Sequence, residues 1–191
     1  MKKLILIRHG RTIANEKLLY CGSSDPGLSS AGKEELRLLR ETRVYPDASG
    51  FDFYTSGMLR ANETLNNLYG NVLFTSVPGF CEMDFGQFEM KSYEKLKDDD
   101  VFLQWLANKN AKAPGGESAD EMKERVIGAL SDVLQVGSDA LIVSHGGTIA
   151  VIMQYLFPGE GRDRYGWQPE PGCGYLIRLD SAGNSFKKIP F

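Results

Sequence analysis

The chain contains little histidine or cysteine and lacks a long apolar run. Its 191 residues include two histidines and three cysteines, and the cysteines are widely spaced without a CxxC pair. An odd number of such cysteines argues against a disulfide framework and favours the reducing cytoplasm. The apolar run at residues 4–7 is too short for a signal peptide, and nothing approaches the length of a membrane span. We therefore expect a cytoplasmic protein without a membrane partner.

Blocks of like charge are scarce as well. The net charge is −3 and no basic block occurs, so a nucleic-acid-binding surface is not expected. The aspartates at residues 98–100 are interpreted as a solvated turn rather than a metal site. Because the sequence has no internal repeat and no linker, we expect a single domain over residues 1–191. The sequence leaves the oligomeric state open.

Strand and helix signals alternate along the chain. Strands are expected at residues 3–7, 51–54, 72–75 and 140–143, with a closing hairpin at 175–179 and 186–189. Helices are expected after Ser29, around Leu65 and Leu68, after a capping box at Ser118 and Glu121, and over residues 148–156. This alternation predicts an α/β fold, a three-layer sandwich whose mostly parallel central sheet has helices on both faces. The irregular stretches at residues 78–93 and 158–174 are long enough to be functional loops.

Both histidines follow a short apolar run and precede a glycine. His9 comes after residues 4–7 and Arg8, and His145 comes after residues 141–143 and a serine. The carboxyl ends of buried strands meet at one crevice of an open α/β sheet, so both imidazoles are expected there. A neutral imidazole is a nucleophile, and the planar guanidinium of Arg8 suits a phosphate. The alternative is a histidine that satisfies a strand-end carbonyl beside a surface arginine.

Two further segments point to an anion. Arg60 is expected in the first turn of a helix, where the helix dipole disfavours a cation; a bound phosphate would profit from both this guanidinium and the free amides. The alternative is an exposed arginine. His145 precedes Gly146, Gly147 and Thr148 at a strand-to-helix junction, which is typical of an anion-binding turn.

An acidic segment lies between the two histidines. Glu82, Asp84 and Glu89 are interleaved with apolar and aromatic residues, and partial desolvation raises the pKa of a carboxyl group so that it can hold a proton near neutrality. Spacing alone does not choose among the three. The alternative is a polar loop over an aromatic anchor. The turn at residues 114–118 positions a helix start.

In this order, the segments resemble those of the histidine phosphatase superfamily, the phosphoglycerate mutase-like phosphatases. The motif of Arg8 and His9 continues to Asn15, and the stretch that follows includes residues 20–22. Residues 56–64 are similar to the second arginine motif of the family, Glu82 with residues 85–86 to the motif that carries its acid, and residues 144–147 to its second histidine motif. The resemblance runs from residue 2 to about residue 156.

The resemblance implies a role for each matched residue. His9 would be the nucleophile that becomes phosphohistidine, and Glu82 would protonate the leaving oxygen and later activate water. Arg8, Arg60 and His145 would clamp the phosphoryl oxygens. The residues that would contact the substrate from the surrounding motifs are Thr12, Asn15, Cys21, Gly22 and Gly146. No metal and no organic cofactor is implied.

Within the superfamily, the short chain and the stretch from Trp105 to residue 118 are most similar to the alpha-ribazole phosphatase branch of cobalamin assembly. This implies alpha-ribazole 5′-phosphate, or a similar small phosphomonoester, as the substrate. Tyr165 and Trp167 would form an aromatic wall for its base or, alternatively, cap the sheet.

Three rival functions stay open. The first is a mutase that returns the phosphoryl group to a substrate hydroxyl, which needs a site for a second acidic group. Arg162 and Arg164 are candidates for that site but are expected to be solvated. The second is a phosphate-recognition module that has lost its chemistry. The third is a two-histidine metal hydrolase, which needs further ligands at metal distance.

Overall fold

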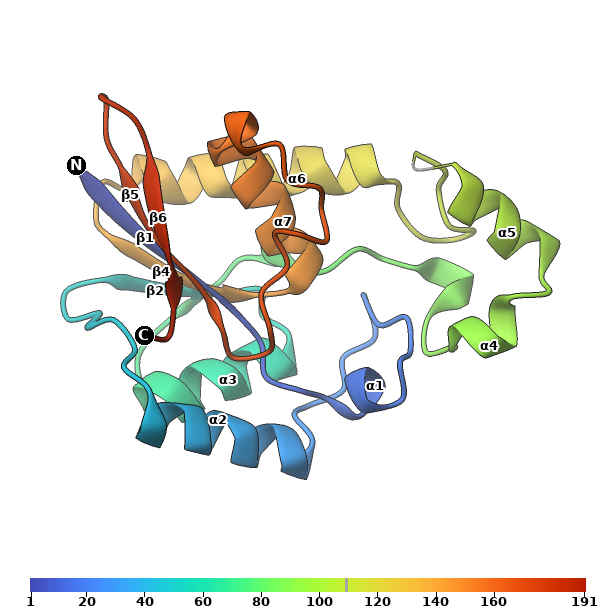
Figure 1. Cartoon of the computed structure of the whole chain (residues 1–191), viewed down its shortest axis with the longest axis horizontal. Helices are drawn as coiled ribbons and strands as arrows, with labels where there is room; N and C mark the ends of the chain where they lie inside the picture. The colour runs from blue at the N-terminus through green and yellow to red at the C-terminus, as the bar shows by residue number, and fades with distance from the viewer. Residues whose placement is uncertain (109) are drawn as a thin grey trace.

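The computed structural model describes residues 1–108 and 110–191, and within them six strands form one mixed sheet (Figure 1). The strand order is β3-β2-β4-β1-β5-β6. The strands are β1 (Lys2–Arg8), β2 (Asp52–Thr55), β3 (Thr75–Ser76), β4 (Ala140–Ser144), β5 (Gly174–Leu179) and β6 (Ser185–Ile189). Strands β1 to β4 pair in parallel, and β5 and β6 extend the sheet as an antiparallel hairpin. The expected sheet and its closing hairpin are confirmed, apart from the third strand of that expectation.

The register of the central strands sets the position of the site. Parallel pairing places Arg8 of β1 opposite Ser144 of β4, and Thr55 of β2 opposite Val143 of the same strand. The carboxyl ends of the three strands therefore lie at one edge of the sheet. The residues that follow them, His9, Ser56 and His145, come together at this edge.

Helices cover both faces of the sheet, as the alternation of elements predicts. In Figure 1, α2 (Ser30–Thr42) and α3 (Leu59–Tyr69) lie on one side, and α6 (Ala119–Gln135) and α7 (Gly146–Leu156) lie on the other. Three shorter helices lie beyond the sheet edge: α1 (Ile13–Glu16), α4 (Tyr93–Leu96) and α5 (Asp100–Ala107). Single turns of 3₁₀ helix occur at Pro78–Phe80, Gly86–Phe88 and Pro158–Glu160. No helix within the described residues is long and apolar enough to span a bilayer.

Alternating side chains of β1 divide the core into two layers. Leu4 and Leu6 pack with residues of α6 and α7, whereas Ile5 and Ile7 pack with residues of α2 and α3. All four side chains are fully buried, and each contributes about 1.5–3 kcal/mol relative to an exposed position. The strand that ends at His9 is therefore held firmly from both sides.

A separate aromatic cluster supports the irregular segment after β3. Its buried members, Phe88 and Phe102, contact Tyr20, Phe85 and Trp105, with ring centroids 5.2–6.0 Å apart. Most of these ring pairs pack edge to face, which adds to the stabilisation from burial. The cluster ties α5 to the segment that follows Glu82.

The expected strand at residues 72–75 is wrong. Helix α3 ends at Tyr69 and is followed by Gly70, whose φ of 80° suits glycine, and the chain then crosses back to the sheet edge. Pairing with β2 begins only at Thr75. Val72 and Phe74 are apolar because they pack against the α2–α3 core layer, while Leu73 is exposed.

The three short helices α1, α4 and α5 were not predicted from the sequence pattern. Four residues, the length of α1 and of α4, show no helical periodicity, and α5 has eight. The aspartates at residues 98–100 mark its start, because the Asp99 carboxylate accepts hydrogen bonds from the backbone N–H groups of Val101 and Phe102. The expected capping box at Ser118 and Glu121 is confirmed at the start of α6.

Candidate active site

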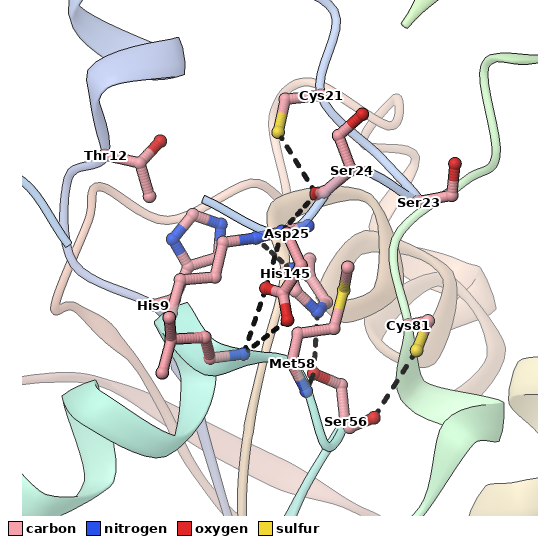
Figure 2. Close-up of polar contacts among 12 residues, drawn as sticks. His9, Thr12, Cys21, Ser23, Ser24, Asp25, Ser56, Met58, Cys81 and His145 are labelled. Carbon is pink, nitrogen blue, oxygen red and sulfur yellow. Dashed lines mark hydrogen bonds and ion pairs between the residues drawn. The ribbon is translucent and has the colours of Figure 1, made fainter. Parts of the chain in front are cut away.

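The two histidines stand side by side at the carboxyl ends of β1 and β4. Their ring centroids are 5.1 Å apart, and both residues are buried. The His9 backbone N–H donates to the carbonyl of Ser144 (2.9 Å), which ties the end of one strand to the other. Figure 2 shows the two rings with Ser56 hydrogen-bonded to His145.

The hydrogen bond of His9 defines its reactive nitrogen. Nδ1 lies 2.7 Å from the carbonyl oxygen of Gly10, and a carbonyl only accepts, so Nδ1 carries the proton and Nε2 the lone pair. Burial lowers the pKa of His9 well below its ordinary value, and the positive charges of Arg60 and Arg8 lower it further. The ring is therefore neutral and nucleophilic at neutral pH.

His145 is held neutral by two partners. Arg60 Nε donates to His145 Nδ1 (3.2 Å), because a guanidinium has no acceptor. The proton of His145 then resides on Nε2, which donates to the Ser56 hydroxyl (2.8 Å). Burial lowers the pKa of His145 well below its ordinary value, and His9, Arg60 and Arg8 reinforce this.

Arg60 is almost fully buried in the first turn of α3, so the exposed-arginine alternative is wrong. Its Nη1 donates to the carbonyl of Ser24 (2.7 Å) and its Nη2 to the carbonyl of Gly22 (2.8 Å). The Asp25 carboxylate lies 3.5 Å from Nη1. A buried guanidinium is costly unless its donors are satisfied, and the loop that contains Gly22 and Ser24 satisfies them.

Arg8 reaches the site from the end of β1. Its Nη1 donates to the carbonyl of Pro169 (2.9 Å), while its buried Nε has no hydrogen-bond partner among the described residues. Burial lowers the pKa of Arg8, and Glu82 partly counters this. A Cβ at Gly146 would lie 3.3 Å from Arg8 Cζ, so glycine at this position gives the guanidinium room. The unpartnered Nε is a donor suited to an anion.

Cys21 and Gly22, the expected substrate contacts, bond within their own loop. The Cys21 thiol, whose pKa is raised by burial, donates to the Ser24 carbonyl (3.5 Å). The Glu89 carboxylate accepts from the backbone N–H groups of Gly22, Ser23 and Ser24, and also from that of Phe85. Glu89 thereby shapes the loop whose carbonyls hold Arg60.

Of the three candidate acids, Glu82 faces the strand ends. Its Oε2 accepts from the Gly147 N–H (2.8 Å), its Oε1 from its own neighbour Met83 N–H (2.9 Å), and 14% of its side chain is exposed. Asp84 accepts from Gly86 N–H and the Ser23 hydroxyl, and Glu89 holds the loop described above. The structure thus separates three carboxylates that spacing left equivalent.

Thr12 and Asn15 bond to each other and cap α1. The Asn15 side-chain oxygen accepts from the backbone N–H and the hydroxyl of Thr12, both at 3.0 Å. The Thr12 hydroxyl in turn accepts from the Asn15 N–H (3.3 Å). This capping box begins three residues after His9, and it fixes the course of the chain that leads away from His9.

The segment at residues 158–174 brings to Glu82 an arginine that the sequence named only as a candidate. Arg164, expected to be solvated, has Nη2 3.8 Å from Glu82 Oε1, and its buried Nε has no hydrogen-bond partner within residues 1–108 and 110–191. Arg162 lies over the Trp167 ring (4.7 Å). Trp167 is buried against Tyr175 and other core aromatics, so it caps the sheet rather than lining the site. No sequence signal distinguished the two arginines, since both lie in one Gly-rich stretch.

A cavity of about 350 Å³ lies beside Arg164. Its lining includes Met83, Trp105, Leu106 and Tyr165 together with Arg164. The cavity adjoins Glu82, because Met83 follows Glu82 directly and the Arg164 guanidinium lies 3.8 Å from the Glu82 carboxylate. An apolar wall with a few polar groups is typical of a small-molecule site. Within the described residues, no three or more His, Cys, Asp or Glu side chains gather as they do around a metal ion.

Comparison with known proteins places these observations in one family. The sequence profile of the histidine phosphatase superfamily (branch 1) matches residues 4–190. The chain is 34% identical over 190 residues to a protein of Hydrogenobacter thermophilus with the provisional name phosphoserine phosphatase 2, covering 96% of this chain and 87% of that protein. It is 30% identical over 202 residues to a 2,3-bisphosphoglycerate-dependent phosphoglycerate mutase of Parvibaculum lavamentivorans, covering 97% and 94%.

A solved structure of a related protein has the same fold. The alpha-ribazole phosphatase from Shigella flexneri is similar with a TM-score of 0.83 at 26% identity, covering 99% of this chain and 96% of that one. The likeness extends over the sheet and both helical layers, since nearly the whole chain is covered. The α/β fold expected from the sequence is confirmed.

Proposed function

Because the chain belongs to the histidine phosphatase superfamily, we propose that it hydrolyses phosphomonoesters without a metal, through a phosphohistidine intermediate. The observation that carries this proposal is the state of His9. Its Nδ1 is committed to the Gly10 carbonyl, so the lone pair of Nε2 is free, and both Arg8 and Arg60 act on the ring electrostatically. Residues 1–191 serve as one catalytic domain in this proposal.

The first half-reaction transfers the phosphoryl group to His9. Nε2 attacks phosphorus, the bond between phosphorus and the ester oxygen breaks, and Glu82 gives its proton to the departing oxygen. In phosphoryl transfer the protein mainly positions groups and neutralises the equatorial oxygens. General acid help at the leaving oxygen contributes about 10²–10⁴ in rate.

The second half-reaction restores the enzyme. The Glu82 carboxylate takes a proton from water, the resulting hydroxide attacks phosphorus, and the bond to His9 Nε2 breaks to release inorganic phosphate. Glu82 suits this double role because both carboxylate oxygens are held by backbone N–H groups, which keeps the group aimed at one place while leaving it partly exposed.

Arg8, Arg60 and His145 clamp the phosphoryl oxygens in this proposal. Arg8 brings an unpartnered Nε. Burial, and then the nearby positive charges, lower the pKa of His145 in the free protein. A bound dianion opposes both effects, so His145 takes up a proton at Nδ1 and donates it to the anion instead of accepting from Arg60.

The surrounding motif residues act on the substrate from the rim. Thr12 and Asn15 fix the chain beyond His9, and Cys21 and Gly22 form the loop over Arg60. Gly146, at the N-terminus of α7, lies against Arg8. All five are proposed as substrate-binding positions.

The substrate proposed is alpha-ribazole 5′-phosphate or a similar small phosphomonoester, and we propose that the protein acts in cobalamin biosynthesis in the cytoplasm. The Shigella flexneri neighbour supports this choice, and so does the aromatic lining, Trp105 and Tyr165, of the cavity beside Glu82. Phosphoserine is the alternative suggested by the relative from Hydrogenobacter thermophilus.

A mutase reaction is the second candidate, and one observation favours it. Arg164 lies beside Glu82 with an unpartnered Nε, where it is able to hold a second acidic group of a substrate such as phosphoglycerate. A phosphate-recognition module that has lost its chemistry is disfavoured, because binding alone does not need a carboxylate oriented by two backbone N–H groups, as that of Glu82 is. A metal hydrolase is disfavoured because Arg8 and Arg60 repel a cation at His9 and His145.

The test measures phosphate release from 4-nitrophenyl phosphate in excess EDTA, for the natural protein and for His9→Ala. We expect release that resists the chelator and disappears in His9→Ala. Sensitivity to EDTA, or undiminished release by His9→Ala, would contradict the proposal. A panel with alpha-ribazole 5′-phosphate, phosphoserine and phosphoglycerate, scored by kcat/KM, then selects the substrate.

A further inference from the structure

Arg125 of α6 lies outside the group of residues that sequence motifs assign to the site, yet it is bound to the backbone that leads into Glu82. Its Nη1 donates to the carbonyls of Gly79 (3.0 Å) and Cys81 (2.9 Å), and its Nη2 donates to the carbonyl of Glu82 itself (3.3 Å). One guanidinium therefore fixes the segment that enters the proposed acid. We refer to residues 79–84 as the acid loop.

Glu117 holds the other side of the acid loop. Arg125 donates to Glu117 through Nε (3.1 Å) and Nη2 (2.5 Å). Glu117 Oε1 accepts from the Asp84 N–H (3.0 Å), and the Glu117 N–H donates to the Asp84 carbonyl (3.0 Å). The two side chains are 27% and 17% exposed. The ion pair thus spans the backbone on both sides of Glu82.

The helices on the α6–α7 face close around the same backbone. Gly79 lies against Ala129 of α6 so tightly that a Cβ at Gly79 would overlap it. From α7, the Thr148 hydroxyl donates to the Cys81 carbonyl (2.9 Å), and the Gly147 N–H donates to the carboxylate of Glu82. The position of Glu82 relative to His9 is therefore set by how α6 and α7 hold the acid loop.

We propose that Arg125 and Glu117 are positioning residues that set the proton-transfer geometry of Glu82. The inference rests on the proposed phosphatase function. A general acid must lie within hydrogen-bond reach of the oxygen that it protonates, and a misplacement of about 1 Å costs about 10²-fold in rate. Lysine does not replace Arg125, because a single ammonium lacks the planar fork that spans three carbonyls and a carboxylate.

The test separates proton transfer from the rest of the reaction by the leaving group. The alkoxide of 2-phenylethyl phosphate needs a proton to depart, whereas 4-nitrophenolate departs without one. For Arg125→Lys and for Glu117→Gln, we expect kcat/KM to fall about 10–100-fold with 2-phenylethyl phosphate and less than about 3-fold with 4-nitrophenyl phosphate. Equal losses on the two substrates, or no loss, would overturn the inference.

A double variant tests whether Arg125 acts through Glu82. Glu82→Gln alone removes the acid, so adding Arg125→Lys to it should lower kcat/KM for 2-phenylethyl phosphate little further. If the two residues acted independently, the fold-losses of the two single variants would multiply in the double variant.

Arg37→Lys, which alters an exposed ion-paired arginine of α2, is the matched control and should leave kcat/KM unchanged with both substrates. Thermal unfolding of each variant identifies a loss of folding, and Glu117→Gln carries the test if Arg125→Lys does not fold. A natural protein that hydrolyses neither substrate would instead overturn the proposed function, and the inference with it.

Discussion

Arg60 Nε donates to His145 Nδ1 across 3.2 Å of buried space, and this contact fixes the state of the site. Because arginine only donates, His145 must present a lone pair there, so its ring is neutral. His9, whose ring centroid is 5.1 Å away, is neutral as well, since burial and the same guanidinium lower its pKa. The free protein thus keeps two uncharged imidazoles beside two arginines.

Stability is expected to decrease in acid. Burial lowers the pKa of His9 and of His145 well below the ordinary value of about 6.5, at which each titrates in the unfolded chain. As the pH falls below this value, the unfolded chain binds protons that the folded chain does not, so the free energy of unfolding falls. Urea unfolding from about pH 8 to about pH 5 measures the slope. A His9→Gln/His145→Gln variant should show a shallower slope; an identical slope would contradict the assignment.

Arg60→Lys is expected to damage both activity and stability. A lysine cannot satisfy the carbonyls of Gly22 and Ser24 and the His145 nitrogen together, and kcat/KM for 4-nitrophenyl phosphate should fall about 10²–10³-fold. Thermal unfolding should occur at a lower temperature. Arg40→Lys, at a surface arginine that donates to the Asn67 carbonyl, serves as the control. A near-normal kcat/KM of Arg60→Lys would contradict the proposal that Arg60 binds the phosphoryl oxygens.

Gly147→Ala is expected to separate activity from stability. A Cβ at Gly147 would overlap the Glu82 carboxylate and Arg164 Nη2, and both are ends of flexible side chains that can move aside. We expect kcat/KM for 2-phenylethyl phosphate to fall at least about 10-fold, with little change in thermal unfolding.

Gly128→Ala provides the contrast. A Cβ at Gly128, within α6, meets open space, so this variant should gain about 0.5–1 kcal/mol of stability and keep its kinetics. Equal kinetics in both variants would mean that the crowding at Gly147 does not matter to Glu82.

Glu89→Gln is expected to destabilise the protein without a leaving-group effect. Four backbone N–H groups converge on this carboxylate, and an amide that turns its NH₂ toward them leaves donors unsatisfied, at a cost of about 1–3 kcal/mol. Urea unfolding measures the loss, with the exposed Glu94→Gln as control. Unchanged stability together with a selective loss on 2-phenylethyl phosphate would make Glu89, not Glu82, the acid.

The sequence predicted well what local patterns determine. The apolar runs before His9 and His145 predicted two strands whose ends meet at one crevice, and the pattern of Ser118 and Glu121 predicted the start of α6. The expected place of Arg60 in the first turn of a helix, where the helix dipole disfavours a cation, predicted that this side chain serves something other than its helix. In the structure Arg60 is buried and donates to His145. These predictions depend on residues close together in sequence.

Long-range contacts could not be predicted in this way. Asp84 and Glu89 have the same local surroundings as Glu82, and only the folded chain shows which carboxylate meets α7. Arg125 and Arg164 reach Glu82 from distant parts of the chain, and no periodicity marks them. The prediction of a strand at residues 72–75 failed because the apolar residues there pack against the core from a connecting segment. Their pattern in the sequence resembles that of a strand.

The central claim, that His9 carries the phosphoryl group, is tested most directly by trapping the intermediate. The protein is mixed with a ³²P-labelled phosphomonoester, quenched within the first turnover and digested. We expect an acid-labile, alkali-stable label on the peptide that contains His9, and none in His9→Ala. Release of phosphate by the natural protein with no labelled peptide, or a label that persists in His9→Ala, would contradict the account.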